Sequence, residues 1–240
     1  MQILKVIARL MDYPKAEVAE SKSEIAEAIA QSRHISPAHR ARLKQTLQAI
    51  YDGELMEAEE AYTGLFDQGR SLSLHLFEHV HGESRDRGQA MVDLMAEYSG
   101  NGFEIDSPEL PDYLPLFLEY LSYRPDLEAR EWLADVSHIL AVLGARLVER
   151  ESPYAHLFES LLLIAGRSEE LEQKREQVAS EEPDNTPEAL DKEWEEVAVT
   201  FGTEDQSCAT PPPANPNEAQ PLRWAEPASN KASITGEQRP

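Results

Sequence analysis

Apolar residues recur at helical spacing along most of the chain. Two stripes with steps of three and four residues are Val136, Ile139, Leu140, Leu143 and Leu147, and Leu114, Phe117, Leu118 and Leu121. This spacing places the apolar side chains of each segment on one face of an amphipathic helix. No segment alternates with period two between tight-turn residues, so the pattern predicts no strands. We expect an all-α fold, built as a single multi-helix bundle.

Turn and cap residues indicate where the helices begin and end. The pairs Ser36-Pro37, Ser152-Pro153 and Thr186-Pro187 each place a hydroxyl before a proline. The hydroxyl can accept from the first helical amides, and the missing N–H of proline costs nothing there, so each pair predicts a helix start. Glycines that tolerate positive φ predict helix ends where the stripes lapse. These are Gly53, Gly69, Gly82, Gly100, Gly102 and Gly166.

Composition divides the chain into three parts. Residues 1–168 carry the dense apolar stripes and form the predicted helical core. Residues 169–202 form an acidic helical extension, because 169–196 hold twelve acidic and three basic residues with few apolar ones. Residues 203–240 contain seven prolines and little apolar surface to offset the entropy of ordering, so this tail is predicted to be disordered.

The charge of the chain limits its partners. Lys and Arg total 22 against 45 Asp and Glu, which gives a net charge of −23. Nucleic acids and anionic membrane surfaces are repelled by such a field, and basic partners are attracted.

Lys5 and Arg9 interrupt the first apolar segment, and no apolar run approaches about 18 residues, so neither an export signal nor direct membrane insertion is expected. Cys208 is the single cysteine, which excludes an internal disulfide and fits a reducing cytoplasm.

A histidine cluster raises the possibility of a metal site. His75, His79 and His81 are close together, and Glu78 lies three residues before His81. A di-iron carboxylate bundle needs a second Glu/Asp-x-x-His pair, for which 135–138 is the candidate, and two further carboxylates that the pattern does not identify. We therefore favour histidines that cap helix ends and hydrogen-bond carboxylates, with no metal and no cofactor. Since no phosphate-binding loop or nucleophile elbow is present either, we predict that the chain is not an enzyme.

Two further groups of residues have alternative interpretations. Arg85 and Arg87 flank Asp86 in a predicted first helical turn, where ion pairs with Glu78 and Glu83 would offset the unfavourable helix dipole. Aromatic and methionine side chains at helical spacing line either a groove for an amphipathic partner helix or the ordinary core. They are Tyr62, Phe66, Met91, Met95, Phe117 and Tyr120.

Three segments, 60–66, 76–91 and 114–122, together resemble the NarJ-type nitrate reductase assembly chaperones of the TorD-like all-helical superfamily. The resemblance is strong over 62–166 and looser over 1–202. One departure is that Pro125-Asp126 is followed by Leu127, whereas relatives that serve exported enzymes often have histidine after this aspartate. This difference favours the NarJ branch.

The resemblance implies a cytoplasmic, TorD-like chaperone without turnover. Its client would be the N-terminal segment of the apo catalytic (alpha) subunit of respiratory nitrate reductase. That subunit would be held for insertion of the molybdenum cofactor and iron–sulfur clusters before membrane docking, with cofactor-biosynthesis proteins as further partners. The alternatives are a chaperone for another molybdoenzyme and the di-metal bundle enzyme. The client-binding residues would be Tyr62, Phe66, His75, Phe77, His79, His81, Glu83, Arg85, Asp86, Arg87, Met91, Pro115, Phe117, Glu119 and Tyr120.

Overall fold

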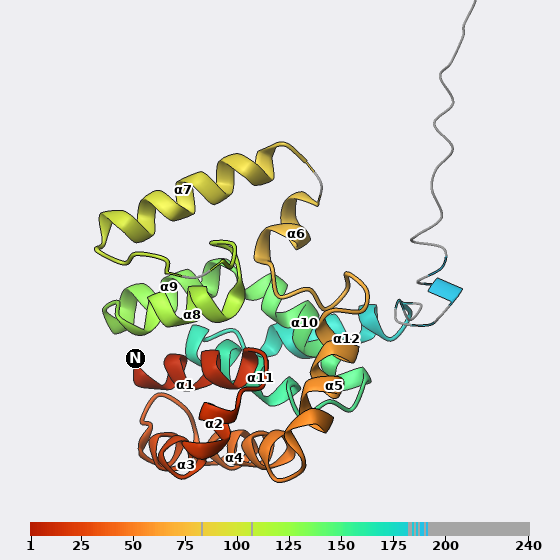
Figure 1. Cartoon of the computed structure of the whole chain (residues 1–240). Coiled ribbons are helices and arrows are strands. Elements are labelled where there is room, and N and C mark those ends of the chain that lie inside the picture. The colour runs from red at the N-terminus through yellow and green to blue at the C-terminus, as the bar shows by residue number, and fades with distance from the viewer. Residues whose placement is uncertain are drawn as a thin grey trace, which may run out of the picture. The chain divides into compact units, whose positions relative to one another are not determined.

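The computed structural model describes residues 1–82, 84–106 and 108–181, and residues 184, 186, 188, 189 and 191 individually. This described part contains twelve helices and no strand, which confirms the predicted all-α class (Figure 1). The helices are α1 (Gln2–Met11), α2 (Ala16–Glu20), α3 (Lys22–Gln31), α4 (Pro37–Tyr51), α5 (Leu55–Phe66), α6 (Leu76–His81), α7 (Asp86–Gly100), α8 (Leu114–Ser122), α9 (Asp126–Asp135), α10 (Ser137–Glu149), α11 (Ala155–Ala165) and α12 (Glu169–Val178). They belong to one compact unit, Met1–Glu196, and the predicted disordered tail lies outside the described residues.

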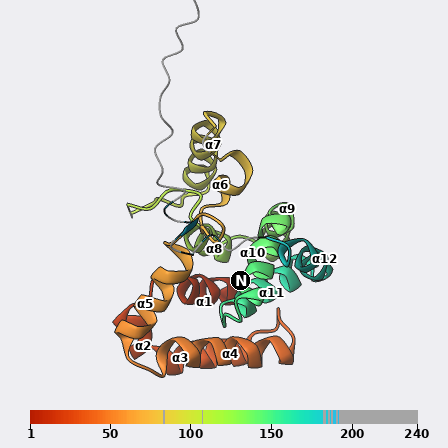
Figure 2. The same cartoon turned by 90° about the vertical axis from the view of Figure 1, so that its right-hand side faces the viewer.

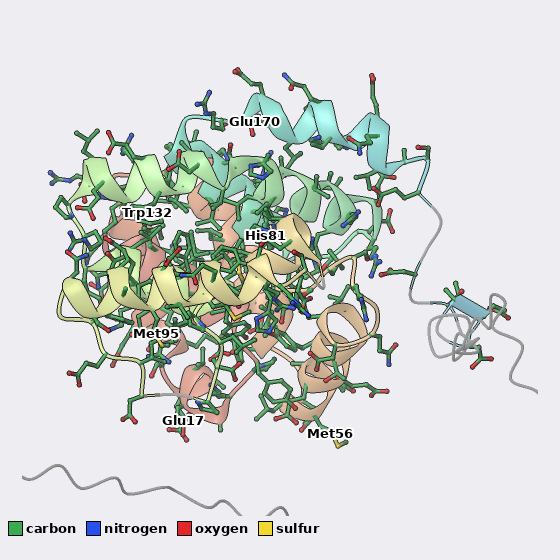
Figure 3. The ribbon with its side chains drawn as sticks, turned by 90° about the horizontal axis from the view of Figure 1, so that it is seen from above. Glu17, Met56, His81, Met95, Trp132 and Glu170 are labelled. Carbon is green, nitrogen blue, oxygen red and sulfur yellow. The ribbon has the colours of Figure 1, made fainter. Side chains whose placement is uncertain are left out.

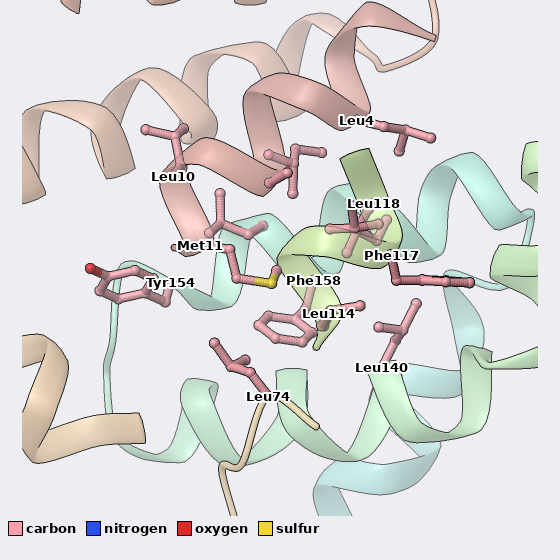
Figure 4. Packing of buried hydrophobic residues seen from close by; sticks show 14 of the residues in the cluster. Leu4, Leu10, Met11, Leu74, Leu114, Phe117, Leu118, Leu140, Tyr154 and Phe158 are labelled. Carbon is pink, nitrogen blue, oxygen red and sulfur yellow. The ribbon is translucent and has the colours of Figure 1, made fainter. Parts of the chain in front are cut away.

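The centre of the core is formed by α1 and α8. Seven of the ten residues of α1 are buried, and the helix packs against α8, α3 and α11. Figure 4 shows Leu4 and Met11 of α1 among Leu118 of α8, Phe158 of α11 and Leu140 of α10. Burial of each such side chain contributes about 1.5–3 kcal/mol, so this contact between distant parts of the chain holds the bundle together.

The C-terminal helices pack around α10, which contacts α9, α11 and α12. Gly144 is buried at this contact, and a Cβ at its position would lie 3.0 Å from Leu171 of α12 and 3.1 Å from Phe158 of α11. The acidic helix α12 docks through its two buried residues, Leu171 and Val178. The absence of a side chain at position 144 therefore lets three helices approach closely.

The predicted helix boundaries can be compared with the observed ones. Ser36 caps α4 as expected, because its Oγ accepts from the amide of His39 at 3.2 Å. Ser152 accepts instead from the amide of Tyr154, so a turn intervenes and α11 begins two residues later than the pair predicts. Thr186 accepts from the amide of Ala189 at 3.2 Å, in agreement with a helix start there. Gly166 ends α11 in the left-handed conformation, with φ of 71°.

Helices α6 and α7 lie together at one end of this unit, at the top of Figures 1 and 2. Of the fifteen residues of α7, only Leu94 and Tyr98 are buried. The chain leaves and rejoins the body at an antiparallel bridge between His75 and Tyr113. The amide of Leu76 donates to Asp112 O at 3.0 Å, and that of Leu114 donates to Leu74 O at 2.8 Å.

Candidate functional site

Two adjoining hollows lie at the C-terminal end of α1. The first, of about 400 Å³, lies against α8, and the second, of about 390 Å³, continues to α5 and residues 73–75. Both are lined by Asp12, Lys15, Glu109 and Tyr113, so they form one depression, which we name the α1 groove. Its other lining residues are Ala8, Arg9, Asp106, Pro108, Pro115, Leu116 and Glu119 in the first hollow, and Tyr13, Tyr62, Phe66, Asp67, Ser73, Leu74 and His75 in the second.

A chain of hydroxyl groups lies where the two hollows meet. The Tyr113 hydroxyl donates to Asp12 Oδ1 at 3.1 Å, so the Tyr62 hydroxyl, 3.2 Å away, is the donor to Tyr113. Burial raises the pKa of both tyrosines, which keeps both hydroxyls protonated. Asp12 also accepts from Lys15 Nζ at 2.7 Å. Residues from α5, from the end of α1 and from the start of α8 are thereby fixed relative to one another.

The groove combines apolar surface with a surplus of negative charge. Five carboxylates, one arginine, one lysine and His75 occur among its described lining residues. Both the lysine and the arginine are engaged by carboxylates, Lys15 by Asp12 and Arg9 by Glu119, the latter at 3.7 Å. Glu119 also pairs with Lys5 at 3.4 Å. A basic segment with an apolar face would match this surface in both respects.

Asp112 connects three elements beside the groove. Its side chain is fully buried, and its Oδ2 accepts from the amide of Phe77 at 3.1 Å, which caps α6 from a distant loop. Its Oδ1 accepts from Nδ1 of His75 at 3.3 Å, and Arg87 of α7 lies 3.7 Å from Oδ2. Arg87 also pairs with Glu78 of α6 at 3.1 Å. Asp112 thus binds α6, α7 and the loop before α8 through charge-assisted contacts.

The contacts of Asp112 shift two pKa values in opposite directions. The hydrogen bond to Asp112 raises the pKa of His75 above its ordinary value, against the effect of burial. Burial alone would raise the pKa of Asp112, but the bonds from His75 and from the Phe77 amide outweigh it and hold that pKa below its ordinary value. The charged forms of both residues are therefore favoured together.

The other predicted histidines have structural partners. His79 Nε2 donates to the carbonyl of Ser73 at 2.8 Å, and burial lowers its pKa. The ring of His81, labelled in Figure 3, packs edge-on against Phe77 with centroids 5.8 Å apart. Phe77 is half-buried against the core. His75, which directly precedes α6, bonds a carboxylate as expected, but its side chain makes no capping hydrogen bond to the helix. Among these three histidines it alone bonds a carboxylate in the described residues.

The predicted arginine network is present in part. Arg87 makes the ion pairs given above, while Arg85 and Asp86 are exposed at the start of α7. Glu83 lies outside the described residues. Met91 is half-buried, and Met95, labelled in Figure 3, is 46% exposed on α7. None of these residues lines the α1 groove as far as the structure describes it.

The aromatic residues predicted to bind a client lie mostly in the core. Phe117 and Tyr120 are 1% exposed, and Tyr62 and Phe66 are nearly as buried. Tyr62 and Phe66 still line the second hollow, and Pro115 and Glu119 line the first. Five of the predicted residues, His75 included, thus line the hollows, and the peptide-binding role of each stays a prediction. Because the core and a peptide groove both need aromatic residues at helical spacing, the pattern could not separate them.

Most residues that line the groove were absent from the sequence predictions, and so was Asp112 beside it. Tyr113 and Asp12 join the two hollows, and Asp112 holds α6. Asp112 and Tyr113 stand immediately before the apolar stripe of α8, and a buried polar pair at a helix start is a signal that could have drawn attention to them. Their partners are 35 to 101 residues away, which local spacing cannot reveal.

The metal hypothesis finds no geometric support among the described residues, where no three His, Cys, Asp or Glu side chains form a group that could hold a metal ion. His138, which the hypothesis requires, is exposed on α10. Within the same described part, no helix has the length and apolarity needed to cross a membrane.

Comparison with known proteins places the chain in a family. The family model described as nitrate reductase delta subunit matches residues 15–160, more than half of the chain. This chain belongs to the nitrate reductase delta subunit family. It is 47% identical over 205 residues to the nitrate reductase molybdenum cofactor assembly chaperone NarJ of Escherichia coli K12, covering 85% of this chain and 86% of that protein.

Two further relatives of the delta subunit family extend the comparison. The probable assembly chaperone NarW of the same strain is 47% identical over 215 residues, with 90% of each chain covered. The probable NarJ chaperone of Bacillus subtilis is 33% identical over 114 residues, 48% of this chain and 61% of that protein. These relatives are named as assembly chaperones and not as enzymes, so the predicted NarJ-type resemblance and non-enzymatic role are confirmed.

Proposed function

We propose that this protein is an assembly chaperone that binds the N-terminal segment of the apo catalytic subunit of nitrate reductase in the α1 groove. It holds that subunit in the cytoplasm while the molybdenum cofactor and iron–sulfur clusters are inserted, and releases it for membrane docking. Support for the client comes from the relatives, which are named as nitrate reductase molybdenum cofactor assembly chaperones. Contacts with cofactor-biosynthesis proteins would be a consequence of this role.

The observation that carries the proposal is the composition of the groove. The nearly buried rings of Tyr62 and Phe66 and the pair Pro115 and Leu116 form its apolar lining, with carboxylates between them. A short amphipathic helix with basic residues would bury its apolar face against these apolar side chains and pair its positive charges with the carboxylates. The two hollows together, about 400 and 390 Å³, are large enough for several side chains of such a segment.

Titration calorimetry with a synthetic peptide of the catalytic subunit's first residues tests this function. One-to-one binding with a negative heat-capacity change is expected, because apolar surface is buried. Asp106→Lys in the groove should weaken binding about tenfold, which corresponds to about 1.4 kcal/mol. The matched control is Glu176→Lys on the exposed face of α12, which changes the net charge equally and should leave the affinity within about twofold.

Two results would contradict the proposal. Equal weakening by both variants would mean that net charge, and not the groove, determines binding. Preference for the leader peptide of another molybdoenzyme would assign the protein to a different client.

A further inference from the structure

The segment that follows α12 contacts the loop between α5 and α6. Asp184 lies on this segment, more than 100 residues from Ser71 of the loop, yet the two are joined by two hydrogen bonds. The loop comprises residues 67–75 and supplies Asp67, Ser73, Leu74 and His75 to the α1 groove. We propose that Asp184 is a positioning residue that fixes this loop in the shape needed for client binding; the proposal rests on the function proposed above.

Every described contact of the Asp184 carboxylate is directed at the loop or at the arginine that supports it. Oδ2 accepts from the amide of Ser71 at 2.8 Å, and Oδ1 accepts from the Ser71 hydroxyl at 2.7 Å. Arg150, which follows α10, donates to Oδ1 at 2.8 Å and to the Ser71 hydroxyl at 3.0 Å. The carboxylate, the serine and the guanidinium thus form a closed triangle of charge-assisted bonds.

A second arginine extends the connection to the backbone of the loop. Arg146 of α10 donates to the carbonyl of Ser71 at 2.7 Å. The same guanidinium forms a bidentate pair with Glu181, at 2.7 and 3.1 Å. The amide, the hydroxyl and the carbonyl of Ser71 are therefore all bonded, and Asp184 accepts two of these bonds.

The conformation of Gly69 fits the same arrangement. Its φ is 85°, and a Cβ at this position would lie 2.6 Å from Oδ2 of Asp184. Any other residue would be strained and would also displace the carboxylate. The sequence predicted Gly69 as a helix end, but α5 ends at Phe66, and Gly69 lies in the loop beyond it and leaves room for Asp184.

The held loop continues directly into groove residues. Leu72 and Leu74 are buried in the core, so a shift at Ser71 is transmitted to their neighbours. Ser73 lines the groove, its amide donates to Arg70 O at 3.2 Å, and its carbonyl accepts from His79. His75 then meets Asp112. Loss of the Asp184 contacts should increase the mobility of residues 71–75 while the helices of the core stay packed.

The test compares Asp184→Ala with Glu181→Ala. Each variant removes one carboxylate from the segment after α12. Asp184→Ala removes the ion pair with Arg150, and Glu181→Ala removes the ion pair with Arg146. Of the two carboxylates, only Asp184 bonds Ser71. Three quantities are measured for both variants in the full chain. They are the peptide affinity by calorimetry, the midpoint of thermal unfolding, and the rate of amide hydrogen exchange at Ser71, Ser73 and Leu76. We expect Asp184→Ala to weaken peptide binding about fivefold to tenfold and to speed exchange at these amides at least tenfold, with a midpoint close to that of Glu181→Ala.

Gly69→Ala provides an independent route to the same result. It should reproduce the loss of affinity by displacing the carboxylate, and the double variant with Asp184→Ala should bind no more weakly than the weaker single variant. If Asp184→Ala and Glu181→Ala lower the midpoint alike and both leave affinity and exchange unchanged, Asp184 has no positioning role and the proposal is overturned.

Failure of the proposed function would be distinguishable from failure of this proposal. If the unaltered protein does not bind the peptide, the client assignment is wrong. The hydrogen-exchange comparison still decides whether Asp184 holds the groove loop: unchanged protection at Ser73 and Leu76 in Asp184→Ala would overturn the proposal by itself.

Discussion

At the scale of single residues, Asp112 has the most contacts to distant parts of the site. It caps α6, bonds His75 and lies beside Arg87, although its side chain has no exposed surface. A buried carboxylate is stable only when such partners replace water. Any change that removes its charge takes the bonded carboxylate from His75 and leaves Arg87 to its pair with Glu78.

Asp112→Asn is therefore expected to lower the free energy of unfolding by about 2 kcal/mol, the range for hydrogen bonds to charged groups. Urea denaturation measures this change. Asp135→Asn, at the exposed end of α9, is the control and should change stability by less than about 0.5 kcal/mol. Similar values for the two variants would contradict the assigned role of Asp112.

The His75–Asp112 pair makes stability depend on pH. The pKa of His75 is raised above 6.5 in the folded state, so its contribution is complete below pH 6.5 and is lost as the pH rises through the folded value. The pKa of Asp112 is lowered below 3.8, so its contribution is complete above pH 3.8 and is lost as the pH falls through the folded value. Glu78 and Arg87 also face His75, the first favouring and the second opposing its charge.

We expect His75→Gln to remove part of the decline in stability that the unaltered protein shows as the pH rises from about 6 to about 8. Denaturation at a series of pH values, with the exposed His138→Gln as control, measures the difference. Parallel curves for His75→Gln and the unaltered protein would refute the coupling.

At the scale of helices, Gly64 and Gly144 offer a matched comparison. Both lie within helices, but a Cβ at position 64 of α5 would meet nothing within 4 Å, whereas one at position 144 would contact Leu171 and Phe158 at 3.0 and 3.1 Å. Gly64 lowers the stability of α5, and no neighbouring atom requires a glycine there. Gly144, in contrast, is needed for the close approach of α10, α11 and α12.

Gly64→Ala should raise the free energy of unfolding by about 0.5–1 kcal/mol, and Gly144→Ala should lower it by about 1–3 kcal/mol through overpacking. Thermal and urea unfolding measure both. Stabilisation by Gly144→Ala would show that α12 shifts without cost, contrary to the packing described.

Local sequence signals predicted the helices better than their connections. The hydroxyl of Ser36 caps α4 as predicted because capping involves neighbouring residues only. Ser152 also bonds a nearby amide, but Tyr154 lies in a turn, so α11 starts later. The bond from the Phe77 amide to Asp112 spans 35 residues, and a pattern of local spacing contains no information about such a contact. Tyr62, Phe66, His75, Pro115 and Glu119 were predicted to bind a client and do line the groove, but its joining residues Asp12 and Tyr113 were not predicted.

At the scale of the whole molecule, the net charge of −23 should attract a basic client over long distances. Exposed charges are screened beyond about 8 Å at physiological ionic strength. The peptide affinity is therefore expected to fall as salt is raised from low to physiological concentration, mainly through slower association. Stopped-flow and calorimetric titrations across salt concentrations measure this, and an affinity independent of salt would leave only apolar burial as the source of binding.

The antiparallel bridge between His75 and Tyr113 determines where a segment of this protein could be exchanged with that of a homologue. It places His75 and Tyr113, which flank residues 76–112, directly opposite each other, in the kind of pair whose Cα atoms lie about 4.5 Å apart. Residues 76–112, which hold α6 and α7, thus begin and end at one point of the body, although Leu76, Leu94 and Tyr98 pack in the common core. We expect the bridge to survive an exchange of residues 76–112 between homologues, and such an exchange would test which features of client selection depend on this segment.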